Sequence, residues 1–281
     1  TQAPWPARRW SAATGTPPTP QRLTPGADDQ PAHLYYTSGT TGTPKGVILT
    51  HRNVCLHARG AIAELDITGA DIWGHIAPMF HLADAWATFA LTAVGGRHVM
   101  VPRFDAARVL QVLQDQRITL TNLIPTMLNL MASHPEAEGA DWSSFRLLLS
   151  GGAPIAPSLV ERLIRVFGVE YVQTYGMTET SPYLTLSLLD DHQRRLPEAE
   201  QIAIRARTGR PFHRVSLRVV DDQGRPVPAD DRTVGEIQVR GDTVTPGYWN
   251  RPAETAAAFT DDGYLRTGDL AVIDHSGSVN I

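Results

Sequence analysis

Residues 145–174 read FRLLLSGGAPIAPSLVERLIRVFGVEYVQT, which is a short apolar run, a helical pattern and a second apolar run. Pro157 can open the helix because proline fits its first turn, and Leu159, Leu163 and Phe167 recur on one face. The two apolar runs, FRLLL and VEYVQT, are bounded by chain breakers, as buried strands are. A strand, a helix and a strand in this order predict two parallel strands joined by a helix.

The same alternation extends toward the N-terminus. Further apolar runs predict buried strands: HLYYT (33–37), GVILT (46–50), HIAPMF (75–80), RHVMV (97–101) and ITLTNLI (118–124). Asp105 can cap a helix whose apolar residues have helical spacing: Ala106, Val109, Leu110 and Leu113. We therefore expect an α/β fold over residues 32–204, a layered and mainly parallel sheet with covering helices.

The two ends of the chain differ from residues 32–204 in their residue pattern. Residues 1–31 are rich in proline and predict a linker. After about residue 205, strand patterns alternate with tight turns: RVSLRVV (214–220), DDQGRPVP (221–228), VGEIQVR (234–240), AVID (271–274), HSG (275–277) and SVNI (278–281). We expect residues 205–281 to form a smaller antiparallel, β-barrel-like unit.

Composition excludes several classes of protein. The chain of 281 residues is 42% hydrophobic and carries a net charge of −4 without a sustained basic run, so nucleic acid is not the expected partner. Cys55 is the only cysteine, which rules out an intrachain disulfide and a thiolate metal cluster. The most apolar of the long stretches, 85–94, is too short for a bilayer span. A cytoplasmic protein is expected.

The most informative loop is Tyr36–Gly46, YTSGTTGTPKG. Its glycines can turn backbone N–H groups toward an anion, its hydroxyls donate further hydrogen bonds, and its lysine adds a charge, a combination that suits a polyphosphate. It is not a Walker A loop, because Lys45 follows Pro44 and precedes Gly46. The alternative is a solvated turn between strands. The candidate phosphate-binding residues are Thr37, Ser38, Gly39, Thr40, Thr41, Gly42 and Lys45.

This loop resembles the signature loop of the adenylate-forming superfamily, which includes acyl-CoA synthetases, aryl-CoA ligases, luciferases and peptide-synthetase adenylation domains. Five further motifs occur in the family's order: APMFHLADAW (77–86), SGGAPI (150–155), QTYGMTETSP (173–182), GEIQVRGDTVTPGYWNRPAET (235–255) and YLRTGDLA (264–271). The resemblance covers residues 32–281. It implies that a carboxylic acid attacks ATP to give an acyl-adenylate and pyrophosphate, and that a thiol, usually coenzyme A, then takes the acyl group.

The resemblance also assigns roles to single residues. Tyr175 would lie against the adenine, Thr178 would contact phosphate, Glu179 would hold Mg²⁺ and Asp269 would bind the ribose. The plain alternatives are a polar turn after a strand and an Asx turn after Gly268. A further set would border the adenine and the acyl group, where glycines allow close approach: Gly151, Gly152, Ala153, Pro154, Thr174, Gly176 and Met177.

His81 resembles the family's gating aromatic residue, with a structural histidine as the alternative. The expected catalytic set is Thr178, Glu179, Lys45 and His81. His75 and His81 are not spaced as metal ligands are, and no carboxylate is expected beside them, so no zinc site is inferred.

The expected substrate is an apolar carboxylic acid. Peptide-synthetase adenylation domains usually place an aspartate near the position of His81 to hold an amino group, and Asp84 is out of register with that position. The expected acyl pocket is apolar, which favours a fatty acid and leaves an aryl acid open; its lining would be Met79, Leu82, Ala85, Trp86, Gly151, Gly152, Thr174, Gly176 and Met177.

Three functions fit the motifs. The first is the core of an ATP-dependent acid–CoA ligase, the second an acyl-adenylate synthetase that loads a carrier protein, and the third an inert nucleotide-binding module. Compared with the family, the chain stops before the hinge and the lid domain that supplies a catalytic lysine, so we expect a partial enzyme core that adenylates poorly. Apolar surface left uncovered predicts self-association into a homo-oligomer.

Overall fold

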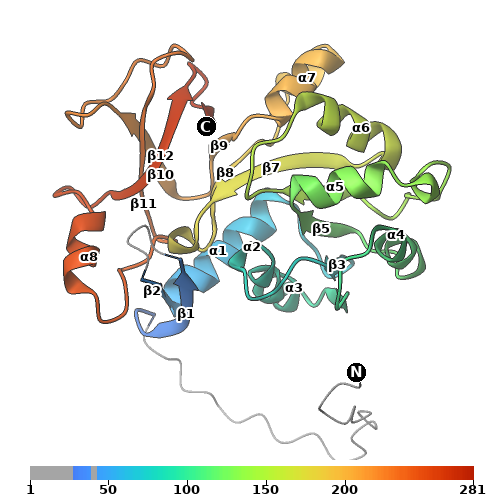
Figure 1. Ribbon diagram of the computed structural model, residues 1–281, viewed down its shortest axis with the longest axis horizontal. Coiled ribbons are helices and arrows are strands. Elements are labelled where there is room, and N and C mark those ends of the chain that lie inside the picture. The colour runs from blue at the N-terminus through green and yellow to red at the C-terminus, as the bar shows by residue number, and fades with distance from the viewer. Residues whose placement is uncertain (1–27, 39–42) are drawn as a thin grey trace, which may run out of the picture.

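The computed structural model of the protein describes residues 28–38 and 43–281, which form three β-sheets (Figure 1). The greater part of the expected linker, residues 1–27, lies outside the described residues, as do Gly39, Thr40, Thr41 and Gly42 of the candidate loop.

The largest sheet has seven strands in the order β4-β3-β5-β6-β7-β8-β9. The first five are parallel, and β8 and β9 are each antiparallel to their neighbour. The strands are β3 (Ile72–His75), β4 (Arg97–Met100), β5 (Leu120–Leu123), β6 (Leu147–Ser150), β7 (Glu170–Gly176), β8 (Tyr183–Leu186) and β9 (Arg210–Pro211). The predicted parallel pair β6 and β7 is confirmed.

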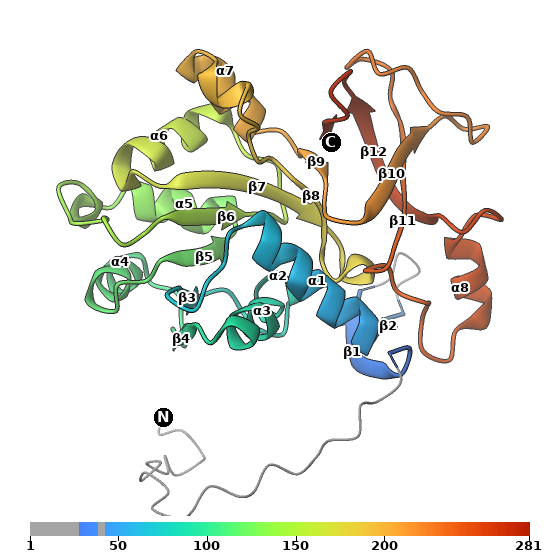
Figure 2. The same cartoon turned by 180° about the vertical axis from the view of Figure 1, so that it is seen from behind.

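Helices cover both faces of this sheet. Side chains alternate across β6, so Leu148 packs on one face and Leu147 and Leu149 pack on the other. The Leu148 face is covered by α4 (Ala106–Asp115), α5 (Pro125–Ala132) and α6 (Pro157–Phe167), with α7 (Glu198–Arg205) at its edge. The opposite face, seen from behind in Figure 2, is covered by α1 (His51–Glu64), α2 (Leu82–Ala85) and α3 (Ala87–Val94).

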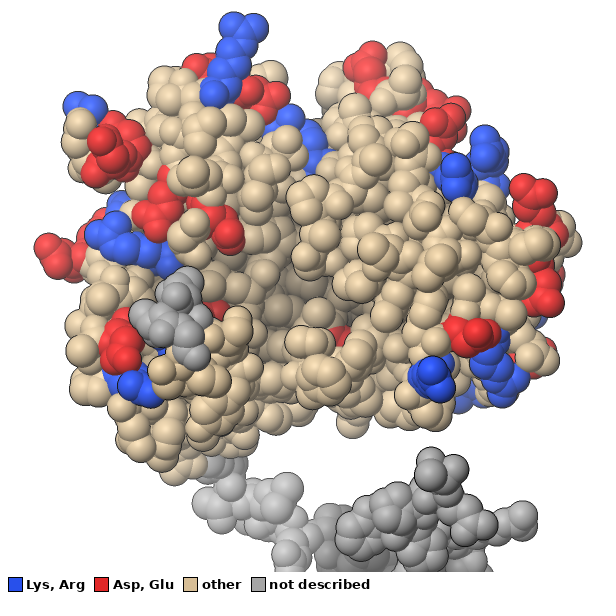
Figure 3. Space-filling model, viewed as in Figure 1, with Lys and Arg blue, Asp and Glu red and all other residues tan. Residues whose placement is uncertain are grey.

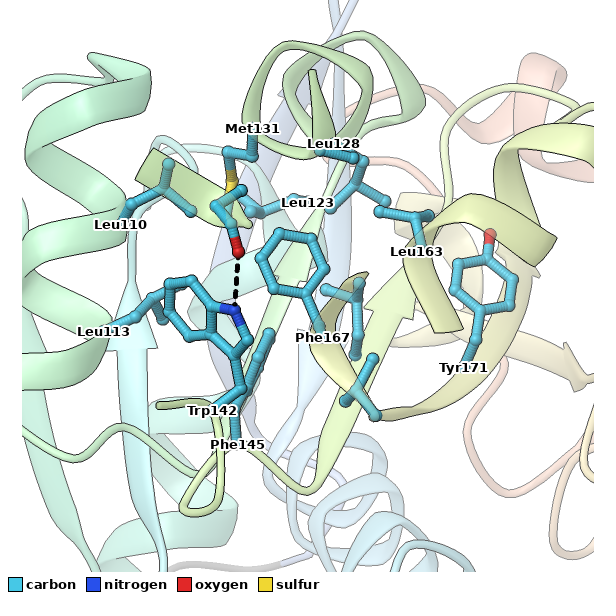
Figure 4. Packing of buried hydrophobic residues seen from close by; sticks show 14 of the residues in the cluster. Leu110, Leu113, Leu123, Leu128, Met131, Trp142, Phe145, Leu163, Phe167 and Tyr171 are labelled. Atoms are coloured by element: carbon cyan, nitrogen blue, oxygen red, sulfur yellow. Dashed lines mark hydrogen bonds between the residues drawn. The ribbon is translucent and has the colours of Figure 1, made fainter. Parts of the chain in front are cut away.

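Local signals explain where the predicted helices begin and end. The Asp105 side chain accepts a hydrogen bond from the Arg108 N–H at 2.9 Å, which caps α4 as expected. Pro157 occupies the first turn of α6, and Gly168 ends this helix in the left-handed conformation with φ of 61°. Figure 4 shows the core beneath these helices, where the Trp142 Nε1–H donates to the Ala137 carbonyl at 3.0 Å.

The second sheet is the smaller antiparallel unit that the sequence predicts. It has the order β10-β11-β12-β13, and its core side chains Ile237 and Val239 pack with Leu184 of β8, which joins it to the large sheet. Its elements are β10 (Val215–Val220), β11 (Gly235–Gly241), α8 (Pro252–Ala258), β12 (Leu265–Ile273) and β13 (Val279–Asn280).

Three of the predicted strands differ from the structure. RHVMV was expected to be buried, but β4 lies at the edge of the large sheet, where Arg97 and Met100 are exposed. The run HIAPMF was expected to be a strand, but β3 ends at His75 and the next residues form a loop into α2, since Pro78 lacks the N–H that a sheet ladder requires. HLYYT was expected to be buried, but β1 (Pro31–Thr37) is half exposed because it pairs only with β2 (Lys45–Thr50) in an antiparallel sheet of two strands.

Three short 3₁₀ helices complete the described chain: η1 (Pro135–Ala137), η2 (Thr178–Thr180) and η3 (Gln193–Arg195). No described helix combines the length and the apolar character needed to cross a bilayer.

Candidate functional site

A pocket opens where the carboxyl ends of β6 and β7 meet the small sheet. Ser150 and Gln173 are paired in the ladder, so the segment after β6 lies beside the last residues of β7. The pocket has a volume of about 280 Å³, and Figure 3 shows a hollow in this region between the two sheets. Its lining is Gly152, Ala153, Pro154, Gln173, Thr174, Tyr175, Gly176, Ala206, Thr208, Asp269, Asn280 and Ile281.

Two glycines make the close packing beside this pocket sterically feasible. A Cβ atom on Gly151 would collide with the Thr174 hydroxyl, which itself donates to the Ser150 carbonyl at 3.1 Å. A Cβ atom on Gly176 would overlap the carbonyl oxygen of Pro182. Larger residues at either position would force these backbone segments apart.

A β-bulge brings Asp269 to the opposite wall. The pairing of β11 with β12 shifts register between Glu236 and Gln238, and Gly268 takes a φ of 77° within the extra residues of β12. Bulges commonly redirect a side chain at functional sites. Here the Tyr175 hydroxyl donates to Asp269 Oδ2 at 2.6 Å. Burial, followed by the hydrogen bond to Asp269, raises the pKa of Tyr175 above its usual value, which keeps the phenol a donor.

A second polar cluster surrounds Glu179, whose residue is only 6% exposed. Its Oε1 accepts a hydrogen bond from the Tyr248 hydroxyl at 2.9 Å, and its backbone carbonyl accepts from the Thr245 N–H at 2.7 Å. Lys45 Nζ lies 5.2 Å from the centre of the Tyr248 ring. Burial and the neighbouring Glu179 carboxylate raise the pKa of the Tyr248 phenol.

This cluster is assembled from three distant parts of the chain. The Gly247 carbonyl accepts from the Ile48 N–H at 3.0 Å, and the Gly46 carbonyl accepts from the Trp249 N–H at 2.7 Å. The segment 245–249 therefore runs along β2, directly after the candidate loop. Thr37, on β1, pairs with Lys45, so the described ends of the loop are held by the hairpin.

The structure brings together most of the described candidate residues. Those that line the pocket are Gly152, Ala153, Pro154, Thr174, Tyr175, Gly176 and Asp269. Met177 and Thr178 are half-buried beside Glu179, and Ser38 is exposed at the end of β1. His81 is exposed at the N-terminus of α2, with its ring centre 4.6 Å from that of Phe80, and it does not line this pocket.

Sequence reasoning missed six residues that the geometry identifies. Gln173 and Tyr248 fall inside the motifs QTYGMTET and GYWN, which signal the site without giving these residues a role. Four more residues line the pocket and lie in no motif: Ala206, Thr208, Asn280 and Ile281. The expected acyl-pocket residues Leu82 and Ala85 of α2, and Trp86 directly after it, are buried in the core on the α1–α3 face of the large sheet.

The expectation from the sequence that His75 has no carboxylate beside it is wrong. Its Nδ1 lies 2.6 Å from Asp84 Oδ2, and its Nε2 lies 2.9 Å from His98 Nδ1. Asp84 Oδ1 accepts from the Trp73 Nε1–H at 3.0 Å. The sequence hides this contact because α2 folds back onto β3. Among the described residues, no group of three or more acidic, histidine or cysteine side chains could hold a metal ion.

A single carboxylate such as Glu179 fits Mg²⁺ bound together with a nucleotide. Mg²⁺ keeps several waters and takes one or two carboxylate oxygens alongside substrate phosphates, so it needs no cage of protein ligands. Glu179 Oε1 is engaged by Tyr248, and Oε2 has no hydrogen-bond partner among the described residues, which leaves an oxygen for a cation.

Comparison with known proteins agrees with the geometry. The family model described as AMP-binding enzyme matches residues 2–249. A long-chain-fatty-acid–CoA ligase of Thermus thermophilus is 39% identical over 88% of this chain and 46% of its own length. A feruloyl-CoA synthase of an Amycolatopsis species is 37% identical over 98% of this chain and 53% of its own length.

A solved structure, that of ATP-bound MatB from Rhodopseudomonas palustris, superimposes with a TM-score of 0.79 at 30% identity, covering 91% of this chain and 48% of that one. The chain thus spans about half the length of the relatives it matches. Because the family model covers most of the chain and three of the motifs meet at one pocket, this protein belongs to the AMP-binding enzyme family.

Proposed function

We propose that this chain is the nucleotide-binding core of an acid–thiol ligase, which activates a carboxylic acid with ATP and transfers the acyl group to coenzyme A. The observation that carries the proposal is the convergence of three separate segments on one pocket: residues 152–154, residues 173–176 and Asp269. The relatives named as CoA ligases support the same activity.

In this proposal the pocket holds the adenosine part of ATP. Tyr175 lies against the adenine and Asp269 accepts from the ribose hydroxyls, while the glycine-containing segment 152–154 lets backbone approach the flat ring. Thr178 donates to phosphate at the next turn of the chain. The loop residues from Thr37 to Lys45 bind the remaining phosphates, with Lys45 as the cation.

The chemistry consists of two displacements. A carboxylate oxygen of the acid attacks the α-phosphorus of ATP, and the bond to pyrophosphate breaks. The thiolate of coenzyme A then attacks the acyl carbon, and AMP leaves. Such reactions depend mainly on positioning and on neutralised charge. Mg²⁺, when held by Glu179, would supply positive charge at the phosphates.

The structure supports an acid without an α-amino group. Asp84, the nearest acidic residue to the position that would hold an amine, is fully buried and engaged by Trp73 and His75. The loops after β3 and β5 lie side by side because these strands are parallel neighbours, and they expose the apolar side chains Phe80 and Ile124. We infer that these loops, with His81 beside Phe80, form the mouth of a site for a fatty acid.

Calorimetric titration with non-hydrolysable acyl-adenylate analogues tests this proposal. Acetyl, octanoyl, palmitoyl and benzoyl analogues are compared with AMP on the same preparation. A fatty-acid site predicts that the octanoyl or palmitoyl analogue binds at least tenfold more tightly than AMP, since each buried CH₂ contributes about 0.8 kcal/mol. Preference for the benzoyl analogue would replace the fatty acid with an aryl acid.

Asp269→Ala and Asp222→Ala are the matched variants for this titration. Asp269 faces the pocket, whereas Asp222 is exposed in the turn after β10. Only the first substitution should weaken every analogue. If a folded wild-type chain binds neither AMP nor any analogue, the proposed function is wrong.

A further inference from the structure

Tyr248 stands between two candidate phosphate-site residues that come from different parts of the chain. Its hydroxyl donates to Glu179 Oε1 at 2.9 Å, and the Lys45 ammonium lies 5.2 Å from the centre of its ring. The described ion pairs include none between Lys45 and Glu179. The phenol thus contacts both opposite charges, and they do not pair with each other.

The backbone of Tyr248 is fixed from two sides. It forms an isolated β-bridge with Val47 on β2, and its N–H donates to the Thr255 hydroxyl of α8 at 3.0 Å. A Cβ atom on the preceding Gly247, which has a φ of 144°, would collide with the same Thr255 side chain. Because its backbone is anchored to both elements, the phenol is a rigid support for the two charged groups.

The hydrogen bond divides the two oxygens of Glu179 between different tasks. Oε1 is occupied by the phenol, and Oε2 has no described partner. Partners that hold a metal-binding side chain from behind fix its orientation, and their removal typically weakens metal affinity or activity by about 10-fold to 100-fold. A side chain in this position is therefore more than a packing residue.

We propose that Tyr248 is the positioning residue of the phosphate site. Its hydroxyl orients Glu179 toward the cation of the metal–nucleotide complex, and its ring binds the Lys45 ammonium and holds it away from that carboxylate. This inference rests on the proposed function, since it concerns the same nucleotide. It assigns two separable tasks to one side chain, one to the hydroxyl and the other to the ring.

Tyr248→Phe removes the hydroxyl and keeps the ring. The Kd of ATP is measured by calorimetry in excess Mg²⁺ and again in EDTA, and the ratio of the two values gives the advantage conferred by the metal. We expect this ratio to fall about tenfold in Tyr248→Phe, while the Kd in EDTA stays within about twofold of wild type. Tyr248→Ala, which also removes the ring, should weaken ATP binding in EDTA as well, because Lys45 loses its cation–π contact with the ring.

Two further variants make the test specific. In a Glu179→Gln background, Tyr248→Phe should have little additional effect on the ratio, because the hydroxyl acts through the carboxylate. Tyr264→Phe is the matched control: its hydroxyl lies 3.0 Å from Ser216 Oγ, its ring packs against Arg218, and it does not line the pocket. It should bind ATP as wild type does under both conditions.

Three results would overturn the assignment. These are an unchanged ratio in Tyr248→Phe, an equal loss with Mg²⁺ and with EDTA, and an undiminished effect in the Glu179→Gln background. In each case wild-type chain still binds ATP and the proposed function stands. If the folded wild-type chain binds no ATP under either condition, the proposed function falls, and the role of Tyr248 falls with it.

Discussion

Asp84 and Asp269 both accept short hydrogen bonds from ring-bearing side chains, yet their surroundings are opposite. Asp84 is fully buried, and both of its oxygens are engaged, by Trp73 at 3.0 Å and by His75 at 2.6 Å. Asp269 lines the pocket at the bulge of β12, and only its Oδ2 is engaged by a described residue, the Tyr175 hydroxyl.

The difference separates groups that hold the framework from groups that are available for a ligand. A buried carboxylate with every oxygen satisfied stabilises one arrangement of its neighbours, whereas a half-satisfied carboxylate on a pocket wall still has hydrogen-bonding capacity. Both aspartates stand out in the sequence as acidic residues within family-like motifs. Burial and partners distinguish them, and these appear only in the folded chain.

Asp84→Ala should cause the largest effect of these substitutions, a loss of stability, because Asp84 holds the framework together. Removing the carboxylate leaves the Trp73 indole N–H and the His75 imidazole buried without their partner, so the free energy of unfolding should fall by about 3–5 kcal/mol. Urea unfolding followed by fluorescence measures this loss. Asp84→Asn, which keeps an acceptor for Trp73, should lose less; an Ala variant as stable as wild type would refute the framework role.

Asp269→Ala should show the reverse pattern. Loss of a charge-assisted pair of hydrogen bonds costs about 1.5–3 kcal/mol, which corresponds to a tenfold to hundredfold weaker affinity for AMP. The free energy of unfolding should change by less than about 1 kcal/mol, because the residue is half exposed. Calorimetry and urea unfolding on one preparation provide both values. A large loss of stability with unchanged affinity would reverse the comparison.

His57 extends the comparison to pH. It is fully buried against the rings of Trp86, Tyr183 and Phe212, and burial lowers its pKa to about 3 from an unfolded value of 6.5. The unfolded chain therefore binds a proton below pH 6.5 that the native chain rejects, so stability is complete above pH 6.5 and falls with acidification toward pH 3.

From pH 8 to pH 5 this residue alone should lower the free energy of unfolding by about 2 kcal/mol. Urea unfolding of wild type and His57→Gln across this range tests the prediction, and the variant should show the smaller decrease. Parallel pH profiles for the two proteins would mean that His57 is protonated equally in the folded and unfolded states.

Much of the framework could be predicted because its signals are local. Helices α4 and α6 were identified by their first residues and by the helical spacing of their apolar side chains. Asp105 caps α4, and Pro157 occupies the first turn of α6. Helix α1 was missed, since its buried face includes the polar residues Asn53 and His57 and does not show a clear apolar stripe. Strand β8, which directly follows the motif at 173–182, was not predicted.

The site could be predicted only in part. Motif resemblance identified Tyr175, Glu179 and Asp269, and the first and last of these meet in the pocket. The contact of Glu179 with Tyr248 joins residues 69 positions apart, and no periodicity or spacing in the sequence predicts such a contact. The Asp84 contact was missed for a related reason, because a helix that reverses onto its preceding strand has no distinct sequence signature.

The segment that lies along β2 also bears on the order in which the molecule can fold. The Thr245 hydroxyl donates to the Ile48 carbonyl across 197 positions of sequence, and Tyr175 meets Asp269 across 94. Contacts of such long range form slowly, and during synthesis they must wait for the later partner to leave the ribosome. The helix-covered strands β3 to β7 can collapse well before that point. The β1–β2 hairpin, which flanks the candidate phosphate loop, would then be held in its final position among the last steps. On the proposed function, the capacity to bind nucleotide would therefore form late in the synthesis of a new chain.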